Sequence, residues 1–564
     1  MIIPGRRGLP IIPVVIGTLA AIAGVLMAVH YHRLGLTLSH YDARGHLVVA
    51  RRIVDSITPG WQQIGAVWLP LPHLLNALPV QIDLMYRSGA SAVAISIASF
   101  AIAAAAIAWI VIELTGSRAA GAVAAAVFGL NPNLLYLQST PMTEPLLIAL
   151  TTASVAMLVQ WCGSADASTI SERDLAATRS ADLSAGALAE VEAFALQPSV
   201  DALAERRAKA LAERPGKALA ERSARLVGVT FALACLTRYE AWFVTVAALG
   251  AAVWTLWRRG STLPAALRLV RSIAVYPVVA VLGFVVFSRV VIGSWFVASG
   301  FFVAENKALG LPVLAAAEIW WGTHMLSGSL VIAIAAVGAL SLLIIGAFSR
   351  RRADAWIVLS LAATAALPWA AFVKGHPFRI RYMVPLLVIE AIGAGVAAGL
   401  TRRAHVVAAL LLLAIAGYDL HPLDARAPMV VEAQWDRPNG PVRQHVTDCL
   451  VAGRDAEKIM ASMGSLGHYM QETSHAGFAL RDYLHEGNGD IWLAALDGPK
   501  PYAGWILIEE KANGGDMLAK RAREEPHFLD GYTRVCEGAG LALYRRNAKR
   551  PFRELTQRTQ RTQR

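Results

Sequence analysis

The chain has 564 residues, of which 56% are hydrophobic and 16% are charged, and its mean hydropathy is +0.48. This composition excludes an ordinary soluble enzyme and favours a membrane protein with several spans. The net charge of +12 does not indicate nucleic-acid binding, because the basic residues gather in short clusters beside apolar runs, as they do in cytoplasmic loops.

The first predicted span covers residues 11 to 30 and follows Arg6 and Arg7. It is long enough to cross a bilayer and lacks a small-residue cleavage site, so we expect a retained signal anchor. The positive-inside rule places the N-terminus in the cytoplasm. Residues 31 to 90 contain no apolar stretch long enough to cross. We therefore predict that they form an extended outer loop.

An apolar stretch at 226 to 257 is interrupted by Arg238-Tyr239-Glu240 and has basic residues on both flanks. Charges at membrane depth persist only where they pair or line a cavity, so we predict a hairpin of two short helices with the charges near its outer apex. Together with the first span and eight other spans, the hairpin gives about 11 helical segments. The other predicted spans cover 91 to 113, 118 to 137, 143 to 162, 272 to 292, 325 to 348, 354 to 373, 383 to 400 and 404 to 419. The remaining outer loops are predicted at 131 to 142, 293 to 324 and 374 to 382.

Two further regions differ in composition from the spans. The segment 163 to 223 is rich in Ala, Glu and Arg and is predicted to be an exposed cytoplasmic insert. Beyond 420, the stretches ASMGSLGHYM, GWILIEE and GLALYRR are typical of helix and strand pieces. The sequence thus predicts a polytopic α-helical membrane domain over 1–420, a small extracytoplasmic α/β domain over 421–548 and a disordered basic polar tail over 549–564. Only Cys449 and Cys536 share a soluble region in which they can pair.

The polar residues that loop composition does not explain collect on the predicted outer side. Asp42 follows the first span, between His40 and His46, and precedes a stretch with the spacing of an interfacial amphipathic helix. A partly desolvated carboxylate there can accept a proton from a sugar or protein hydroxyl. The alternative is a solvated loop aspartate or a helix N-cap.

Glu144 stands on the opening turn of a predicted span, after Thr143 and before Pro145. A helix N-terminus favours an acidic residue through its dipole, so a structural role explains Glu144 as well as a catalytic one does. Arg238 and Glu240 can likewise neutralise each other inside the bundle, although ionisable groups within a membrane generally mark functional sites.

A cluster of cations precedes one of the last spans, where the positive-inside trend does not predict it. A guanidinium is well suited to bind phosphate oxygens in pairs, which favours a phosphate-binding site. Contact with lipid headgroups is the alternative. The residues concerned are Lys374, His376, Arg379 and Arg381, followed by Tyr382.

Over residues 1 to 420 the chain resembles the GT-C superfamily of membrane glycosyltransferases, which contains protein O-mannosyltransferases and the lipid A aminoarabinose transferase. The resemblance consists of short motifs in the family's order along a matching predicted topology. They are Tyr41-Asp42 in the first outer loop, Met142-Thr143-Glu144-Pro145 at an outer turn, Leu236-Thr237-Arg238-Tyr239-Glu240 in the broken hairpin and Arg381-Tyr382-Met383-Val384-Pro385 near the end.

The resemblance implies an inverting transfer, in which Asp42 deprotonates the acceptor while the sugar leaves a polyprenyl phosphate held by the outer cations. Many relatives have two adjacent acidic residues where this chain has Asp42-Ala43, so the second carboxylate is missing or is supplied by Glu144. A divalent metal ion, if one takes part, would be held by these two carboxylates. His73 is a candidate for the substrate cavity. A structural role with a local hydrogen-bond partner is the simpler explanation for a lone histidine. The other residues that the resemblance places around the substrate are Tyr41, His46, Arg238, Tyr239 and Glu240.

The implied partners are a polyprenyl-phosphate-linked sugar, an acceptor that is a protein, a lipid or a glycan, and the bilayer, which we expect to be a bacterial inner membrane. No nucleotide-binding, zinc-protease or esterase motif is present. A secondary transporter or lipid flippase is one alternative, because such proteins also use broken helices with buried charge. A scaffold that keeps the fold without chemistry is another.

Overall fold

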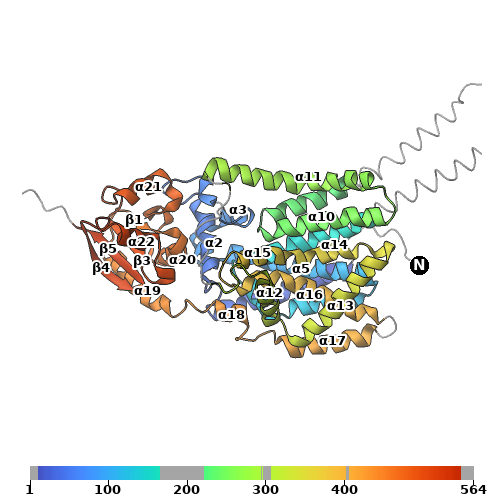
Figure 1. The fold of residues 1–564 in the computed structure, drawn as a ribbon. Coiled ribbons are helices and arrows are strands. Elements are labelled where there is room, and N and C mark those ends of the chain that lie inside the picture. The colour runs from blue at the N-terminus through green and yellow to red at the C-terminus, as the bar shows by residue number, and fades with distance from the viewer. Residues whose placement is uncertain are drawn as a thin grey trace, which may run out of the picture. The chain divides into compact units, whose positions relative to one another are not determined.

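The computed structural model describes residues 11–65, 67–164, 221–293, 295, 306–401 and 405–547 (Figure 1). Nearly all of the predicted insert 163–223 and the tail 549–564 lie outside these residues. The chain divides into two compact units. The helical unit comprises Met1–Leu38, Ala66–Leu75 and Ala90–Glu432, and the sheet unit comprises Ser39–Gly65, Asn76–Gly89 and Ala433–Arg564. This division differs from the predicted boundary at 420, because most of the predicted outer loop belongs to the sheet unit.

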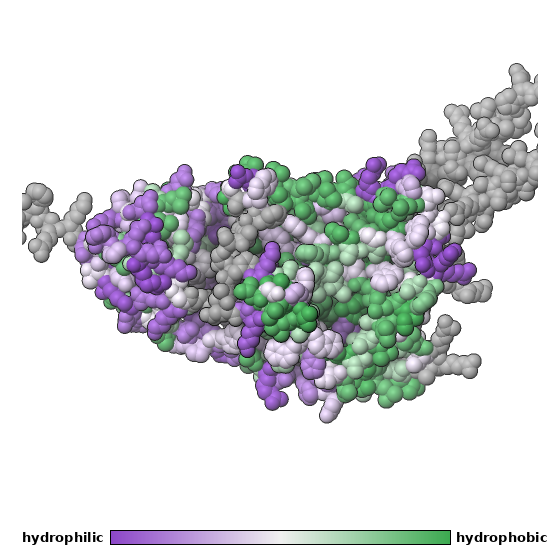
Figure 2. Space-filling view, in the orientation of Figure 1, coloured by the Kyte–Doolittle hydropathy of each residue, from purple (hydrophilic) through white to green (hydrophobic). Residues whose placement is uncertain are grey.

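The helical unit confirms a polytopic α-helical membrane protein. Among the described residues, eight helices are long and apolar enough to cross a membrane, and apolar residues predominate on the visible face of this unit in Figure 2. Its longer helices are α1 (Ile11–Arg33), α5 (Ala90–Thr115), α6 (Arg118–Gly129), Glu144–Ser164, 221–235, α10 (Glu240–Arg258), α11 (Leu263–Phe287), α12 (Pro312–Leu326), α13 (Ser329–Phe348), α16 (Leu387–Leu400) and α17 (His405–Leu420). The shorter ones are α3 (Leu71–Asn76), α7 (Pro132–Leu137), α14 (Ala355–Leu359), α15 (Ala366–Val373) and α18 (Pro428–Glu432).

Small residues allow close packing inside the helical unit. A Cβ atom added to Gly338 of α13 would lie 1.8 Å from the carbonyl oxygen of Gly393 on α16, so the two backbones are in direct contact there. Between membrane helices such close approach supplies van der Waals contact that replaces the missing hydrophobic driving force. Helix α16 also packs against α6 and α5, and α5 against α1.

The predicted hairpin at 226–257 is confirmed, because the helix 221–235 ends just before Arg238 and α10 begins at Glu240. By contrast, 293–324 was predicted only as an outer loop, yet it contains most of α12. The helical path is interrupted between α12 and α13. There the side-chain amides of Asn131 and Asn133 both donate to the carbonyl oxygen of Leu326 at 2.9 Å. These bonds satisfy a helix end that would otherwise leave its carbonyl unpaired.

The sheet unit confirms the predicted small α/β domain. Its strands are β1 (Ile459–Ala461), β2 (Tyr483–Leu484), β3 (Trp505–Glu509), β4 (Tyr532–Gly538) and β5 (Leu541–Arg546), in the order β2-β1-β3-β5-β4. Strand β1 is parallel to β2 and β3, while β5 is antiparallel to β3 and β4. The helices are α2 (Tyr41–Arg52), α4 (Asp83–Ser88), α19 (Asn439–Ala452), α20 (Met463–Thr473), α21 (Asp490–Asp497) and α22 (Met517–Glu524). Hydrophilic residues predominate on the visible face of this unit (Figure 2).

Long-range bonds hold the loop segments in the sheet unit. The carboxylate of Asp55 accepts hydrogen bonds from the backbone N–H of Leu480 at 3.2 Å and from the side chain of Arg481 at 3.0 Å. Gln63 donates to the carbonyl oxygen of Gly487 at 2.7 Å. Helix α2 packs against α20. Helix α2, which carries Asp42, is therefore a structural part of the C-terminal domain.

Candidate active site

A buried ion-pair cluster occupies the turn of the broken hairpin in the helical unit. Glu144 is the first residue of its helix and is 0% exposed. The Nη1 atom of Arg238 lies 2.8 Å from Oε1 of Glu144, and Nη2 lies 2.7 Å from Oε1 of Glu240. Nη1 also donates to the hydroxyl of Thr143 at 3.2 Å. The hairpin thus breaks where a guanidinium can neutralise two carboxylates that an apolar bundle would not tolerate alone.

The second carboxylate oxygen of Glu144 has a different environment. Among the described residues, no hydrogen-bond donor reaches this buried Oε2 atom. A buried carboxylate oxygen without a donor carries a desolvation cost that a bound hydroxyl would relieve. Glu144 is therefore placed to accept a hydrogen bond from a ligand.

Arg381 belongs to the same region of the helical unit. It lies in the 3₁₀ helix η6 (Ile380–Leu386), is 9% exposed, and its guanidinium carbon is 5.5 Å from the centre of the Tyr382 ring. Its charge acts on the charge of Arg238. Two guanidinium groups, one buried and one partly buried, favour an anion beside them.

The other predicted phosphate-binding residues differ in burial. The Nε2 atom of His376 is 3.5 Å from the hydroxyl of Tyr382, and burial together with the charges of Arg379 and Arg381 lowers the pKa of His376. Arg379 is half-buried, and Lys374 is exposed. The residues of the predicted cation cluster therefore differ in exposure, and Arg381 is the buried one.

The remaining cavity candidates of the helical unit have local partners. The Nδ1 atom of His73 lies 3.1 Å from the carbonyl oxygen of Leu69, and its ring stacks on Trp68. The backbone N–H of Leu71 donates to the carbonyl oxygen of Leu236 at 2.9 Å, which attaches this segment to the hairpin turn. The ring of Tyr239 packs against aromatic rings of α10 and α11, those of Trp242 and Phe284.

Asp42 lies in the sheet unit, in the first turn of α2, and is 8% exposed. It is neither a solvated loop residue nor the N-cap. The N-cap is His40, whose Nδ1 accepts from the backbone N–H of Asp42 at 3.1 Å, and Tyr41 stacks on the His40 ring. His46 is buried one helical turn after Asp42. The predicted grouping of Asp42 with Glu144 involves two units and stays a prediction, as does a metal ion between them.

The sequence-based prediction missed a set of charged residues that connects α2 to α20 and α19 within the sheet unit. They come from α2, α19, α20 and the segment before α19, and no short sequence motif indicates them. They are Arg44, Asp436, Arg443, His468 and Glu472.

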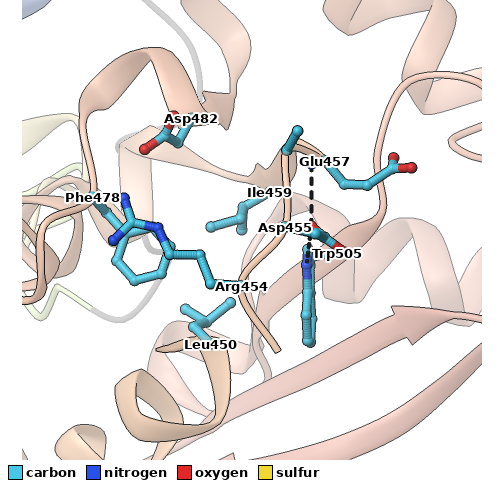
Figure 3. A pocket seen from close by; sticks show the side chains of 9 residues that line it. Leu450, Arg454, Asp455, Glu457, Ile459, Phe478, Asp482 and Trp505 are labelled. Carbon is cyan, nitrogen blue, oxygen red and sulfur yellow. Dashed lines mark hydrogen bonds between the residues drawn. The ribbon is translucent and has the colours of Figure 1, made fainter. Parts of the chain in front are cut away.

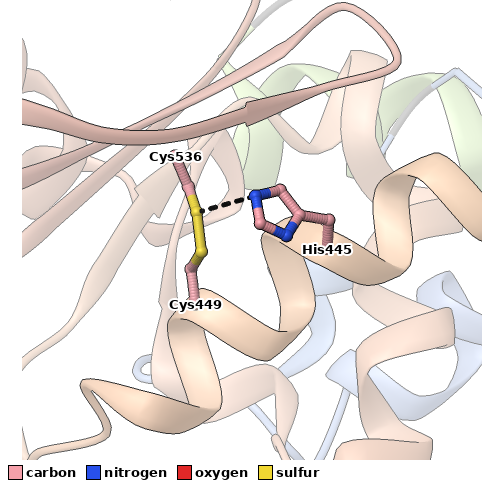
Figure 4. Close-up of side chains that lie close together, drawn as sticks. All are labelled: His445, Cys449 and Cys536. Carbon is pink, nitrogen blue, oxygen red and sulfur yellow. Dashed lines mark hydrogen bonds between the residues drawn. A yellow bond between two sulfur atoms is a disulfide. The ribbon is translucent and has the colours of Figure 1, made fainter.

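Two other features of the sheet unit have simpler explanations. The ligand atoms of His445, Cys449 and Cys536 lie within 4.8 Å of one another, but the two cysteines form a disulfide, which confirms the predicted pairing (Figure 4). A pocket of about 90 Å³ beside Trp505 is lined by groups that already have partners (Figure 3). There Asp455 accepts from Trp505 and pairs with Arg545, and Arg454 stacks on Phe478.

The architecture defines the class as a polytopic helical membrane protein with a small α/β domain. Among solved structures, the chain is similar to ArnT from Cupriavidus metallidurans bound to undecaprenyl phosphate, with a TM-score of 0.52 and 12% identity over 93% of this chain and 97% of that one. The apo state of the same protein gives a TM-score of 0.51 and 13% identity over 93% and 98%. No protein family and no curated protein matches the sequence. The resemblance to the GT-C superfamily is thereby confirmed at the level of the fold.

Proposed function

We propose that this protein is an inverting glycosyltransferase that moves a sugar from a polyprenyl phosphate to an acceptor hydroxyl on the extracytoplasmic face of the membrane. The observation that carries the proposal is the presence of two guanidinium groups in the helical unit, that of the buried Arg381 and that of the partly buried Arg238. Such a pair suits the phosphate of a lipid-linked donor. The fold likeness to ArnT, solved with undecaprenyl phosphate bound, supports the same class of donor.

The proposed chemistry is a single displacement at the anomeric carbon. Asp42 takes the proton of the acceptor hydroxyl as the oxygen of that hydroxyl bonds to the anomeric carbon. The bond from this carbon to the phosphate oxygen breaks, and the electron pair stays on the polyprenyl phosphate, whose added charge Arg381 stabilises. Glu144 accepts a hydrogen bond from a hydroxyl through its Oε2 atom. Attack opposite the leaving phosphate inverts the anomeric configuration.

The compartment and the partners follow from this proposal. A polyprenyl tail needs apolar helix surface open to lipid, which the helical unit has (Figure 2). The disulfide between Cys449 and Cys536 favours an oxidising, extracytoplasmic location for the sheet unit. We propose the bacterial inner membrane as the location, with a protein, a lipid or a glycan as the acceptor.

The test is sugar transfer by the full-length protein in vesicles that contain a labelled polyprenyl-phosphate donor and cell-envelope acceptors. We expect Asp42→Asn to lower turnover about 10²- to 10⁴-fold, the usual contribution of a general base. The matched control is Asp497→Asn, because Asp497 is exposed in the same unit. Retained turnover in Asp42→Asn would remove Asp42 from the mechanism. Movement of the lipid across the bilayer without a new glycosidic product would favour the flippase.

A further inference from the structure

A network of ion pairs connects the helices α2, α19 and α20 of the sheet unit. Its centre is Arg443 of α19, which is almost fully buried. Its guanidinium donates to both carboxylate oxygens of Asp436 at 2.7 Å, and to those of Glu472 at 2.9 Å and 2.6 Å. Bidentate pairing of this kind fixes the orientation of each carboxylate as well as its distance. Glu472 is therefore held in one position from the side of α19.

The same Glu472 carboxylate reaches helix α2. Its Oε1 atom accepts a hydrogen bond from Nη1 of Arg44, and both side chains are mostly buried. Arg44 follows Asp42 by two residues in α2. Since α2 also packs against α20, this ion pair helps to fix the position of the helical turn that carries Asp42.

His468 lies on the same face of α20 as Glu472, one helical turn earlier. Its Nε2 atom is 3.9 Å from Oδ2 of Asp436, which is too long for a hydrogen bond. Burial and the charges of Arg443 and Arg44 lower the pKa of His468 to about 4, although Asp436 and Asp42 act in the opposite direction. The imidazole is therefore uncharged at neutral pH.

We propose that Glu472 of α20 is a positioning residue for Asp42. This inference rests on the proposed function, because it takes Asp42 as the base. In it Glu472 holds α2 through Arg44. The C-terminal domain is then a part of the catalytic machinery and not an appended module.

The activity test separates positioning from simple structural support. We expect Glu472→Gln to lower kcat about 10- to 100-fold, the range for a displaced catalytic group, and to leave the KM for the lipid-linked donor within about twofold. Asp497→Asn, which breaks an exposed ion pair of the same unit, is the matched control.

A second measurement does not depend on activity. In a double-mutant cycle on the thermal unfolding of the full chain in detergent, Arg44→Met and Glu472→Gln should be non-additive, because they remove the same contact. Additive effects, or a folded Glu472→Gln variant with the wild-type kcat, would overturn the proposal. A wild-type chain that transfers no sugar would contradict the proposed function, while the cycle would still decide whether α20 holds α2.

Discussion

The guanidinium of Arg238 lies 2.8 Å from the carboxylate of Glu144 and joins the start of one spanning helix to the turn of the broken hairpin. The same guanidinium also pairs with Glu240. Two carboxylates in an apolar bundle therefore depend on a single cation.

We expect Arg238→Met to destabilise the helical unit by about 3–5 kcal/mol, because both carboxylates then remain buried without their counter-ion. Thermal unfolding in detergent measures this effect. Glu144→Gln combined with Arg238→Met should cost less than the two single changes together. Arg268→Met is the control, because Arg268 is exposed on α11. Equal melting temperatures for Arg238→Met and the control would show that the pair contributes little.

Arg381→Ala should weaken the binding of undecaprenyl phosphate about 10- to 100-fold, since a hydrogen bond to a charged group contributes about 1.5–3 kcal/mol. Titration of the lipid against the purified protein gives the Kd. Arg350→Ala provides the comparison, because Arg350 is exposed and lies outside the predicted site. If Arg381→Ala weakened acceptor binding by the same factor, a specific role for Arg381 at the leaving phosphate would be refuted.

Acid should destabilise the sheet unit. Burial lowers the pKa of His468 to about 4 and that of His485 to about 3, whereas both titrate near 6.5 when unfolded. Below pH 6.5 the unfolded chain thus binds more protons, so stability falls as the pH drops toward about 4. Asp516 acts in the opposite direction, because burial raises its pKa to about 6, and it offsets part of the loss.

Urea unfolding at pH 7 and pH 4.5 measures this loss. His468→Gln should reduce it by up to about 3 kcal/mol, the value of its pKa shift. His527→Gln should leave it unchanged, because His527 is exposed. An unchanged pH dependence in His468→Gln would mean that His468 is not held uncharged in the folded protein.

Cys449 and Cys536 should resist alkylation in intact cells and react only after reduction, because the proposed location of their domain is oxidising. Mass spectrometry of the peptides measures which cysteines have been alkylated. Cys162 and Cys235 are buried thiols outside this disulfide, so they should react after denaturation without a reductant. Reactive thiols at Cys449 and Cys536 in untreated cells would place the sheet unit in the cytoplasm.

The spans could be predicted from the sequence because their signal is local. A run of apolar residues identifies a crossing helix, and the charges of Arg238 and Glu240 identify the hairpin turn, where the structure has them. Helix α12 was missed because its 15 residues are fewer than a crossing helix needs. The break after Leu326 depends on the amides of Asn131 and Asn133, which no apolar pattern contains.

The candidate site was predictable only in part, for a related reason. Glu144 stood out because an acidic residue opens an apolar run, and Arg381 because cations there oppose the charge trend. Nothing near Asp42 in the sequence indicates Glu472, which lies 428 residues from its ion-pair partner Arg44. Contacts at that separation depend on the tertiary fold, so the C-terminal domain could be predicted but not its hold on α2.

The sheet unit consists of segments that are far apart in the sequence, so it can fold only after its last segment has been synthesised. Helix α2 emerges early in synthesis, but Glu472 follows Arg44 by 428 residues, which is roughly 20–90 s at usual elongation rates. During that time the face of α2 that later packs on α20 has no partner in the chain. Premature termination before α20 would leave this face of α2 without the packing that α20 supplies.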